Sequence, residues 1–84
     1  MKAEINIQIQ SPHAKEIINS LKVDNINIPQ GMQIDMNYNE NFANIKIIME
    51  ISSPKDILTL RNTADEILEH ANLIINLLEN KRIA

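Results

Sequence analysis

Three segments of this chain alternate apolar and polar residues, and this alternation limits the fold more than any other feature of the sequence. Residues 3–9, 32–38 and 43–51 each carry apolar side chains at every second position. Successive side chains of a strand point to opposite faces, so each segment predicts a strand with one buried and one solvated face. The polar turn at residues 39–41 predicts that the last two strands form a hairpin.

Two other segments carry apolar residues at helical spacing. Residues 12–22 follow Ser11 and begin with Pro12, which predicts a capping serine and a proline at the first helical position. Residues 54–80 follow Ser53, and Asp56 three residues later predicts a capping box. The predicted core-facing stripe of this second helix is Ile57, Leu60, Ala64, Ile67, Leu68, Ala71, Ile74, Ile75 and Leu78.

The order of these segments predicts an α+β fold of the type β-α-β-β-α. A three-stranded antiparallel sheet with both helices on one face covers the apolar side of every strand. A right-handed crossover between the first two strands places the third strand between them. With 84 residues, the chain is predicted to form one domain, residues 1–84.

The composition argues against several classes of function. The chain has 8 basic and 11 acidic residues and a net charge of −3, and its aromatic residues are Tyr38 and Phe42. A negative charge opposes phosphate binding, and so few aromatic rings offer little for base stacking. The sequence contains no cysteine, no Gly-rich phosphate loop and no nucleophile motif, so no catalytic, cofactor-binding or metal-binding residue is predicted. We expect a non-enzymatic, cytoplasmic protein with no cofactor and no membrane partner.

The second helix has another apolar side, which the sheet is not expected to cover. A helix of about 27 residues spans roughly 40 Å and a strand of about nine residues roughly 30 Å, so the helix is predicted to extend past the sheet. Leu73 and Leu77 fall in that distal part, nearly opposite the core stripe, with Glu66 and His70 on the same side. Two interpretations stay open: ordinary surface leucines, or a contact with another chain. Open edge strands also favour association, so a dimer or a subunit is predicted.

Two stretches of the sequence resemble a known family. Ser20-Leu21-Lys22-Val23-Asp24-Asn25, followed by Pro29, Gly31 and Ile34, resembles the helix end and loop of the small dimerising, Pcc1-type subunit of the KEOPS complex. Residues 59–65, Thr-Leu-Arg-Asn-Thr-Ala-Asp, resemble the helix motif of that family. The chain departs from the pattern at Asn62, where a smaller residue is usual, and its last helix lacks an aromatic residue often found there.

The resemblance implies a function. KEOPS places a threonylcarbamoyl group on an adenosine of certain tRNAs, and the family supplies a non-catalytic scaffold. Such a subunit forms a homodimer, binds the catalytic threonylcarbamoyltransferase subunit through its helices and supports tRNA binding. Together with the exposed leucines, this predicts a partner or dimer interface at Leu58, Arg61, His70, Leu73 and Leu77, and tRNA contacts at Arg61, Lys81 and Arg82.

Alternatives remain at the level of both the residue and the protein. Arg61 can instead pair with Asp65, one turn further along the same helix. The chain can instead be a paralogous accessory subunit that forms a heterodimer with the standard small subunit. A stand-alone RNA-binding module is a further alternative.

Overall fold

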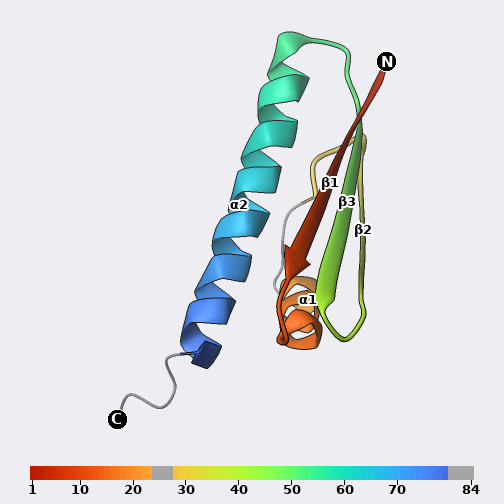
Figure 1. Cartoon of the computed structure of the whole chain (residues 1–84). Helices are drawn as coiled ribbons and strands as arrows, with labels where there is room; N and C mark the ends of the chain where they lie inside the picture. The colour runs from red at the N-terminus through yellow and green to blue at the C-terminus, as the bar shows by residue number, and fades with distance from the viewer. Residues whose placement is uncertain (24–27, 80–84) are drawn as a thin grey trace.

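A computed structural model of the chain describes residues 1–23 and 28–79. The elements follow in the predicted order: β1 (Lys2–Gln10), α1 (Ala14–Val23), β2 (Met32–Tyr38), β3 (Phe42–Glu50) and α2 (Pro54–Glu79). The long helix α2 runs beside the whole sheet, whereas the shorter α1 lies near one end of it (Figure 1). The predicted α+β fold is confirmed.

The sheet has the predicted strand order, with β3 in the centre. Antiparallel pairing joins β3 to β1 on one side and to β2 on the other. The rows of the sheet run straight across all three strands, so that Asn6, Lys46 and Asp35 form one row. The predicted hairpin is closed at Asn39, whose N–H donates to the Phe42 carbonyl (2.9 Å) and whose side-chain oxygen accepts from the Phe42 N–H (2.9 Å).

The loop before β2 turns at the one glycine of the chain. Gly31 has a φ of 84°, in the left-handed region that residues with a side chain adopt at a cost. In this conformation its carbonyl accepts a hydrogen bond from the Glu50 N–H (3.2 Å), which ties the loop to the end of β3. Residues 24–27, between α1 and β2, lie outside the described residues.

The core lies between the inner face of the sheet and both helices. It is made of aliphatic and methionine side chains, as the composition requires. The buried residues are Ala14, Ile17, Ile18, Leu21, Met32, Ala43, Ile45, Ile47, Met49, Leu60, Ala64, Ile67 and Ala71. The inner side chains of β3 are covered almost completely, whereas those of β1 (Ala3, Ile5, Ile7, Ile9) are only half-buried.

The two helix starts differ from each other in how closely they follow the sequence prediction. Helix α1 begins at Ala14, two residues later than predicted, because the Ser11 hydroxyl accepts from the His13 N–H (3.0 Å) and forms a turn before the helix. Helix α2 begins at Pro54 as predicted. The Asp56 carboxylate reaches back and accepts from the N–H groups of Ser52 (2.8 Å) and Ser53 (3.2 Å). This is the carboxylate half of the predicted capping box, and it satisfies N–H groups at the helix start that lack a helical partner.

The predicted core stripe of α2 was wrong at two positions. Ile57 is 56% exposed and Leu68 is 38% exposed, although the other predicted members are buried or half-buried. Both side chains lie on one flank of the stripe, roughly 60–80° around the helix from Leu60, where the sheet no longer faces them. Thr63 is buried instead, and its hydroxyl donates to the Thr59 carbonyl (2.9 Å).

The lengths of the helix and the strands predicted that the distal turns of α2 extend past the sheet. In the structure, these turns still contact the core. Ile74 and Ile75 are partly buried and pack against the core cluster. Leu73 and Leu77, on the outer side of the same turns, are 56% and 63% exposed. The outward direction of the two leucines is therefore confirmed, but the inner side of these turns is not left unsupported.

We predict that Ile67→Ala lowers the free energy of unfolding by about 3 kcal/mol, because the side chain is fully buried and its removal leaves a cavity. Leu58→Ala, in the same helix, is the control: its side chain is 58% exposed, and the change should be within about 0.5 kcal/mol. Urea unfolding of the two variants measures both values. Equal effects of the two substitutions would contradict the described position of α2.

Candidate protein-interaction site

The distal outer side of α2 presents two exposed leucines beside acidic side chains. Leu73 and Leu77 are one turn apart, and Glu66 and Glu69 precede them on the exposed side of the helix. A shallow hollow on this side is lined by Glu66, Glu69, His70, Asn72, Leu73 and Asn76. This combination of apolar side chains and a negative rim can receive an apolar partner surface that carries basic residues.

His70 connects this surface to α1. Its imidazole is half-buried, and Nε2 lies 3.4 Å from the hydroxyl of Ser20, near the C-terminal end of α1. Ser20 belongs to the first stretch that resembles the KEOPS subunit, and Leu21 beside it is buried in the core. The described part of that stretch therefore holds the two helices together, and His70 is partly engaged within the molecule.

The second family-like stretch, residues 59–65, divides into inward and outward side chains. Leu60 and Ala64 are buried in the core, and the hydroxyl of Thr59 donates to the Lys55 carbonyl (3.1 Å). On the outside, Arg61 Nε lies 4.0 Å from Asp65 Oδ2, and both side chains are well exposed. The sequence alternative of an Arg61–Asp65 pair is therefore present in the structure, at a distance that makes it weak.

The predicted interface residues do not form one patch. His70, Leu73 and Leu77 lie together on the distal part of α2. Leu58 is exposed near the start of the same helix, and Arg61 points to the opposite flank, roughly 160° around the helix axis from Leu77. Lys81 and Arg82, predicted to contact tRNA, lie outside the described residues.

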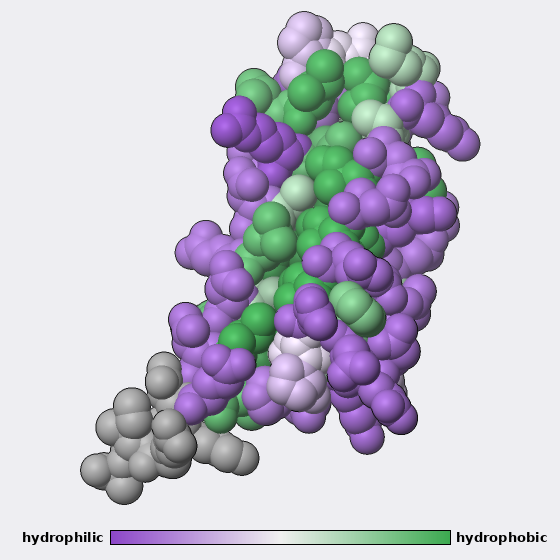
Figure 2. Space-filling model, in the orientation of Figure 1, coloured by the Kyte–Doolittle hydropathy of each residue, from purple (hydrophilic) through white to green (hydrophobic). Residues whose placement is uncertain are grey.

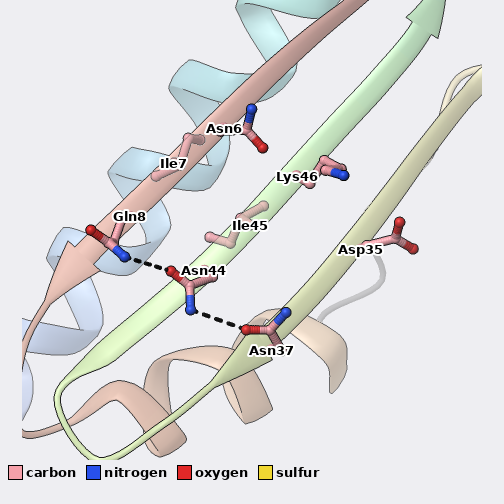
Figure 3. A pocket seen from close by; sticks show the side chains of 8 residues that line it. All are labelled: Asn6, Ile7, Gln8, Asp35, Asn37, Asn44, Ile45 and Lys46. Carbon is pink, nitrogen blue, oxygen red and sulfur yellow. Dashed lines mark hydrogen bonds between the residues drawn. The ribbon is translucent and has the colours of Figure 1, made fainter.

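The open face of the sheet is polar and its amide groups bond to one another. Gln8 donates to Asn44 (3.1 Å) and Asn44 donates to Asn37 (3.0 Å), so one row of amides crosses all three strands (Figure 3). Lys46 and Asp35 lie in the next row. The hollow over these rows has the mutually satisfied groups of a solvated sheet face, and the alternating sequence already predicted its polarity.

A second apolar surface was missed by the sequence reasoning. Figure 2 shows it as a strip along the junction of α2 and β1, with polar surface on both sides. The inner side chains of β1 are half-buried, and α2 exposes Ile57 and Leu68 on the flank roughly 140–160° around the helix from His70, which lies near α1. Part of the signal was in the sequence, because Ile57, Leu68 and Ile75 lie within roughly 20° of one another around the helix axis, on one flank of the core stripe.

In the part of the chain that the structure describes, His, Cys, Asp and Glu side chains form no group of three suited to a metal ion. Within residues 1–23 and 28–79, no helix has both the length and the apolar character needed to cross a bilayer.

The fold and its surfaces define a small α+β domain whose prominent exposed features are apolar surfaces suited to other polypeptides. A family model described as "Transcription factor Pcc1" matches residues 2–79, nearly the whole chain. The chain belongs to this family. No curated protein and no solved structure gives a match.

Family membership confirms the resemblance found from the two sequence stretches. The Pcc1 family consists of non-catalytic subunits of a multi-subunit complex, so the chain works with protein partners.

We predict that Arg61→Ala changes the free energy of unfolding by no more than about 0.5 kcal/mol, because the pair with Asp65 is exposed and long. Asp65→Ala is the matched variant and should have an equally small effect. Urea unfolding at low and moderate salt measures both. A loss several times larger for Arg61→Ala alone would show that this side chain has a structural role in the monomer.

Proposed function

We propose that this chain is a non-catalytic scaffold subunit of a KEOPS complex, which makes threonylcarbamoyladenosine in tRNA in the cytoplasm. In this proposal it binds the catalytic threonylcarbamoyltransferase subunit and dimerises with itself or with a paralogue. The observation that supports it most strongly is the family match over residues 2–79. The two family-like stretches agree with it, since one joins α1 to α2 through Ser20 and His70 and the other anchors α2 to the core.

We assign the catalytic subunit to the distal outer side of α2. Leu73 and Leu77 provide an apolar pair one turn apart, the spacing with which a helix engages another helix. The adjacent Glu66 and Glu69 favour a partner helix with basic residues beside its apolar ones. In this assignment His70, which contacts Ser20 of α1, lies at the edge of the surface that binds the catalytic subunit.

Direct RNA binding by the isolated chain has less support. The net charge is −3, which opposes binding to phosphates. The open sheet face carries amide side chains and a row in which Lys46 is paired in register with Asp35, so it is not a basic surface. Its aromatic residues, Tyr38 and Phe42, lie at the hairpin end of the sheet, so the face lacks a stacking platform. In the proposal the chain supports tRNA binding chiefly through the assembly, with Arg61, Lys81 and Arg82 as its own candidate contacts.

We predict that Leu77→Asp reduces co-purification with the catalytic subunit by at least about tenfold, because it places a charge in an apolar contact. The variant should stay folded by circular dichroism, since the Leu77 side chain is 63% exposed. Asn62→Asp is the control: it adds the same charge at an exposed position of the same helix, far from the distal outer side, and removes no apolar group.

Two outcomes would count against the proposal in different ways. Normal co-purification of Leu77→Asp would remove the assignment of the catalytic subunit to this surface. Failure of the unmodified chain to co-purify with the catalytic subunit, and failure to support tRNA modification in the reconstituted complex, would contradict the function itself.

A further inference from the structure

Strand β2 forms one edge of the sheet, and the hydrogen bonds at its ends show which of its backbone groups face outward. The Glu50 N–H donates to the Gly31 carbonyl (3.2 Å), and the Asn39 N–H donates to the Phe42 carbonyl (2.9 Å). In an antiparallel pair, alternate residues bond to the neighbouring strand. The odd-numbered residues of β2 therefore bond to β3. The even-numbered residues direct their N–H and C=O groups to the outer edge: Met32, Ile34, Met36 and Tyr38.

The backbone of β2 does not itself prevent a further strand from pairing there. In the part of the chain that the structure describes, β2 pairs with β3 on one side and with no strand on the other. All seven residues of β2 pair with β3 without a bulge, and none of them is proline. An edge of this kind recruits other strands unless side chains or local hydrogen bonds oppose it.

Asp35 is the one charged residue of β2 and lies at its centre. Its side chain is exposed on the open face, and its carboxylate accepts from the Gln33 amide of the same strand (3.2 Å to Oδ2). Figure 3 shows this carboxylate directed to the outer side of β2, away from Lys46. The backbone of Asp35 bonds to β3, so toward a new strand Asp35 occupies a non-hydrogen-bonded position, where opposite side chains are closest.

Pairing between the β2 edges of two copies would bring two of these carboxylates together. Antiparallel pairing about a two-fold axis is centred on one residue. Centring on Asp35 pairs all of residues 32–38 and places the two carboxylates directly opposite each other, with a Cα–Cα distance of about 4.5 Å. Centring on Ile34 or Met36 pairs residues 32–36 or 34–38 and leaves the two Asp35 residues on a diagonal, roughly 7–8 Å apart. Each of these registers sets like charges against each other within about one Debye length.

The turn before β2 adds a second obstacle. The Met32 N–H, the first outward donor of the strand, donates to the Pro29 carbonyl (3.1 Å). Pairing over the full strand would therefore lack one hydrogen bond in each copy. The next two outward donors belong to Ile34 and Met36, the residues on either side of Asp35. The turn shortens the usable edge, and the carboxylate lies beside what remains of it.

We propose that Asp35 limits assembly of this chain, because its carboxylate prevents β2 of one copy from pairing with β2 of another. This goes beyond the proposed function, which assigns no role to the β2 edge. A protein that associates with its own copies through two different surfaces forms an open-ended assembly. A charge at the β2 edge confines association to the other surfaces, as a subunit of a complex of fixed composition requires.

The experiment replaces Asp35 and measures the mass of the purified chain by light scattering over a wide range of concentration. Asp35→Thr removes the charge and adds a residue that favours strands, and we expect its mass at high concentration to be at least about twice that of the unmodified chain. Asp35→Asn, which removes the charge with little change of shape, should act in the same direction. Asp35→Glu keeps the charge and should keep the mass of the unmodified chain.

Two further measurements show whether the charge and the edge are responsible. Gln33→Thr is the matched control, since it places the same strand-favouring residue at the neighbouring exposed position of the open face and keeps Asp35. Its mass should not change. In associated Asp35→Thr, the outward N–H groups of Ile34 and Met36 should exchange with solvent at least about tenfold more slowly than in the unmodified chain, because a second strand then covers them.

The possible results divide clearly. Equal masses for the unmodified chain, Asp35→Thr and Asp35→Asn would overturn the proposal, and so would an equal increase in Gln33→Thr. A larger mass without slower exchange at Ile34 and Met36 would place the association on another surface and would also overturn it. If Asp35→Thr fails to fold, Asp35→Asn decides the matter. Binding of the catalytic subunit is measured separately, so the proposed function can fail or hold independently of this result.

Discussion

The structure depends on how two helices of unequal length cover one face of a three-stranded sheet. Helix α2 has 26 residues and α1 has 10, so α2 spans the length of a nine-residue strand and α1 spans about half of it. The central strand β3 lies under both helices, and its inner side chains are buried. The inner side of β1 lies beneath the edge of α2 alone and stays half-covered. The unequal lengths of the two helices therefore explain both why β3 is buried and why β1 is only half-covered.

Helix α2 consequently has three sides with different roles. Its inner side, with Leu60, Ile67 and Ala71, holds the helix on the core. One flank borders the β1 edge and carries exposed Ile57 and Leu68, and the distal outer side carries Leu73 and Leu77. The proposed scaffold role needs separate surfaces for different protein partners, and a long amphipathic helix on a small sheet can present them without an added domain.

Most of the fold was predictable from the sequence, because period-two and helical patterns act locally. Strand alternation correctly placed Ile45 and Ile47 inside, and the crossover rule gave the central position of β3. The errors arose where the packing of elements against one another determines which side chains are buried and where a helix begins. The helical pattern cannot say how wide a stripe the sheet covers, so Ile57 and Leu68 were assigned to the core. The Ser11 turn that delays α1 to Ala14 depends on one side-chain hydrogen bond that competes with the first helical turn.

The candidate site was less predictable than the fold. Leu73 and Leu77 were found because they lie opposite the core stripe, which spacing alone reveals. The contact between Ser20 and His70 joins residues 50 positions apart, so only the folded chain brings them together. The apolar surface along α2 and β1 forms only when a strand and a helix are placed side by side, which the spacing of residues along either element does not reveal.

The mass of the purified chain in solution tests most directly whether it associates through the surfaces that a single copy leaves uncovered. Light scattering across a wide range of protein concentration should give twice the chain mass of 9.6 kDa if the chain pairs with itself, or the mass of a one-to-one complex once a paralogue is added. A mass of 9.6 kDa at every concentration, for the chain alone and in mixtures with a paralogue or the catalytic subunit, would contradict association as its function.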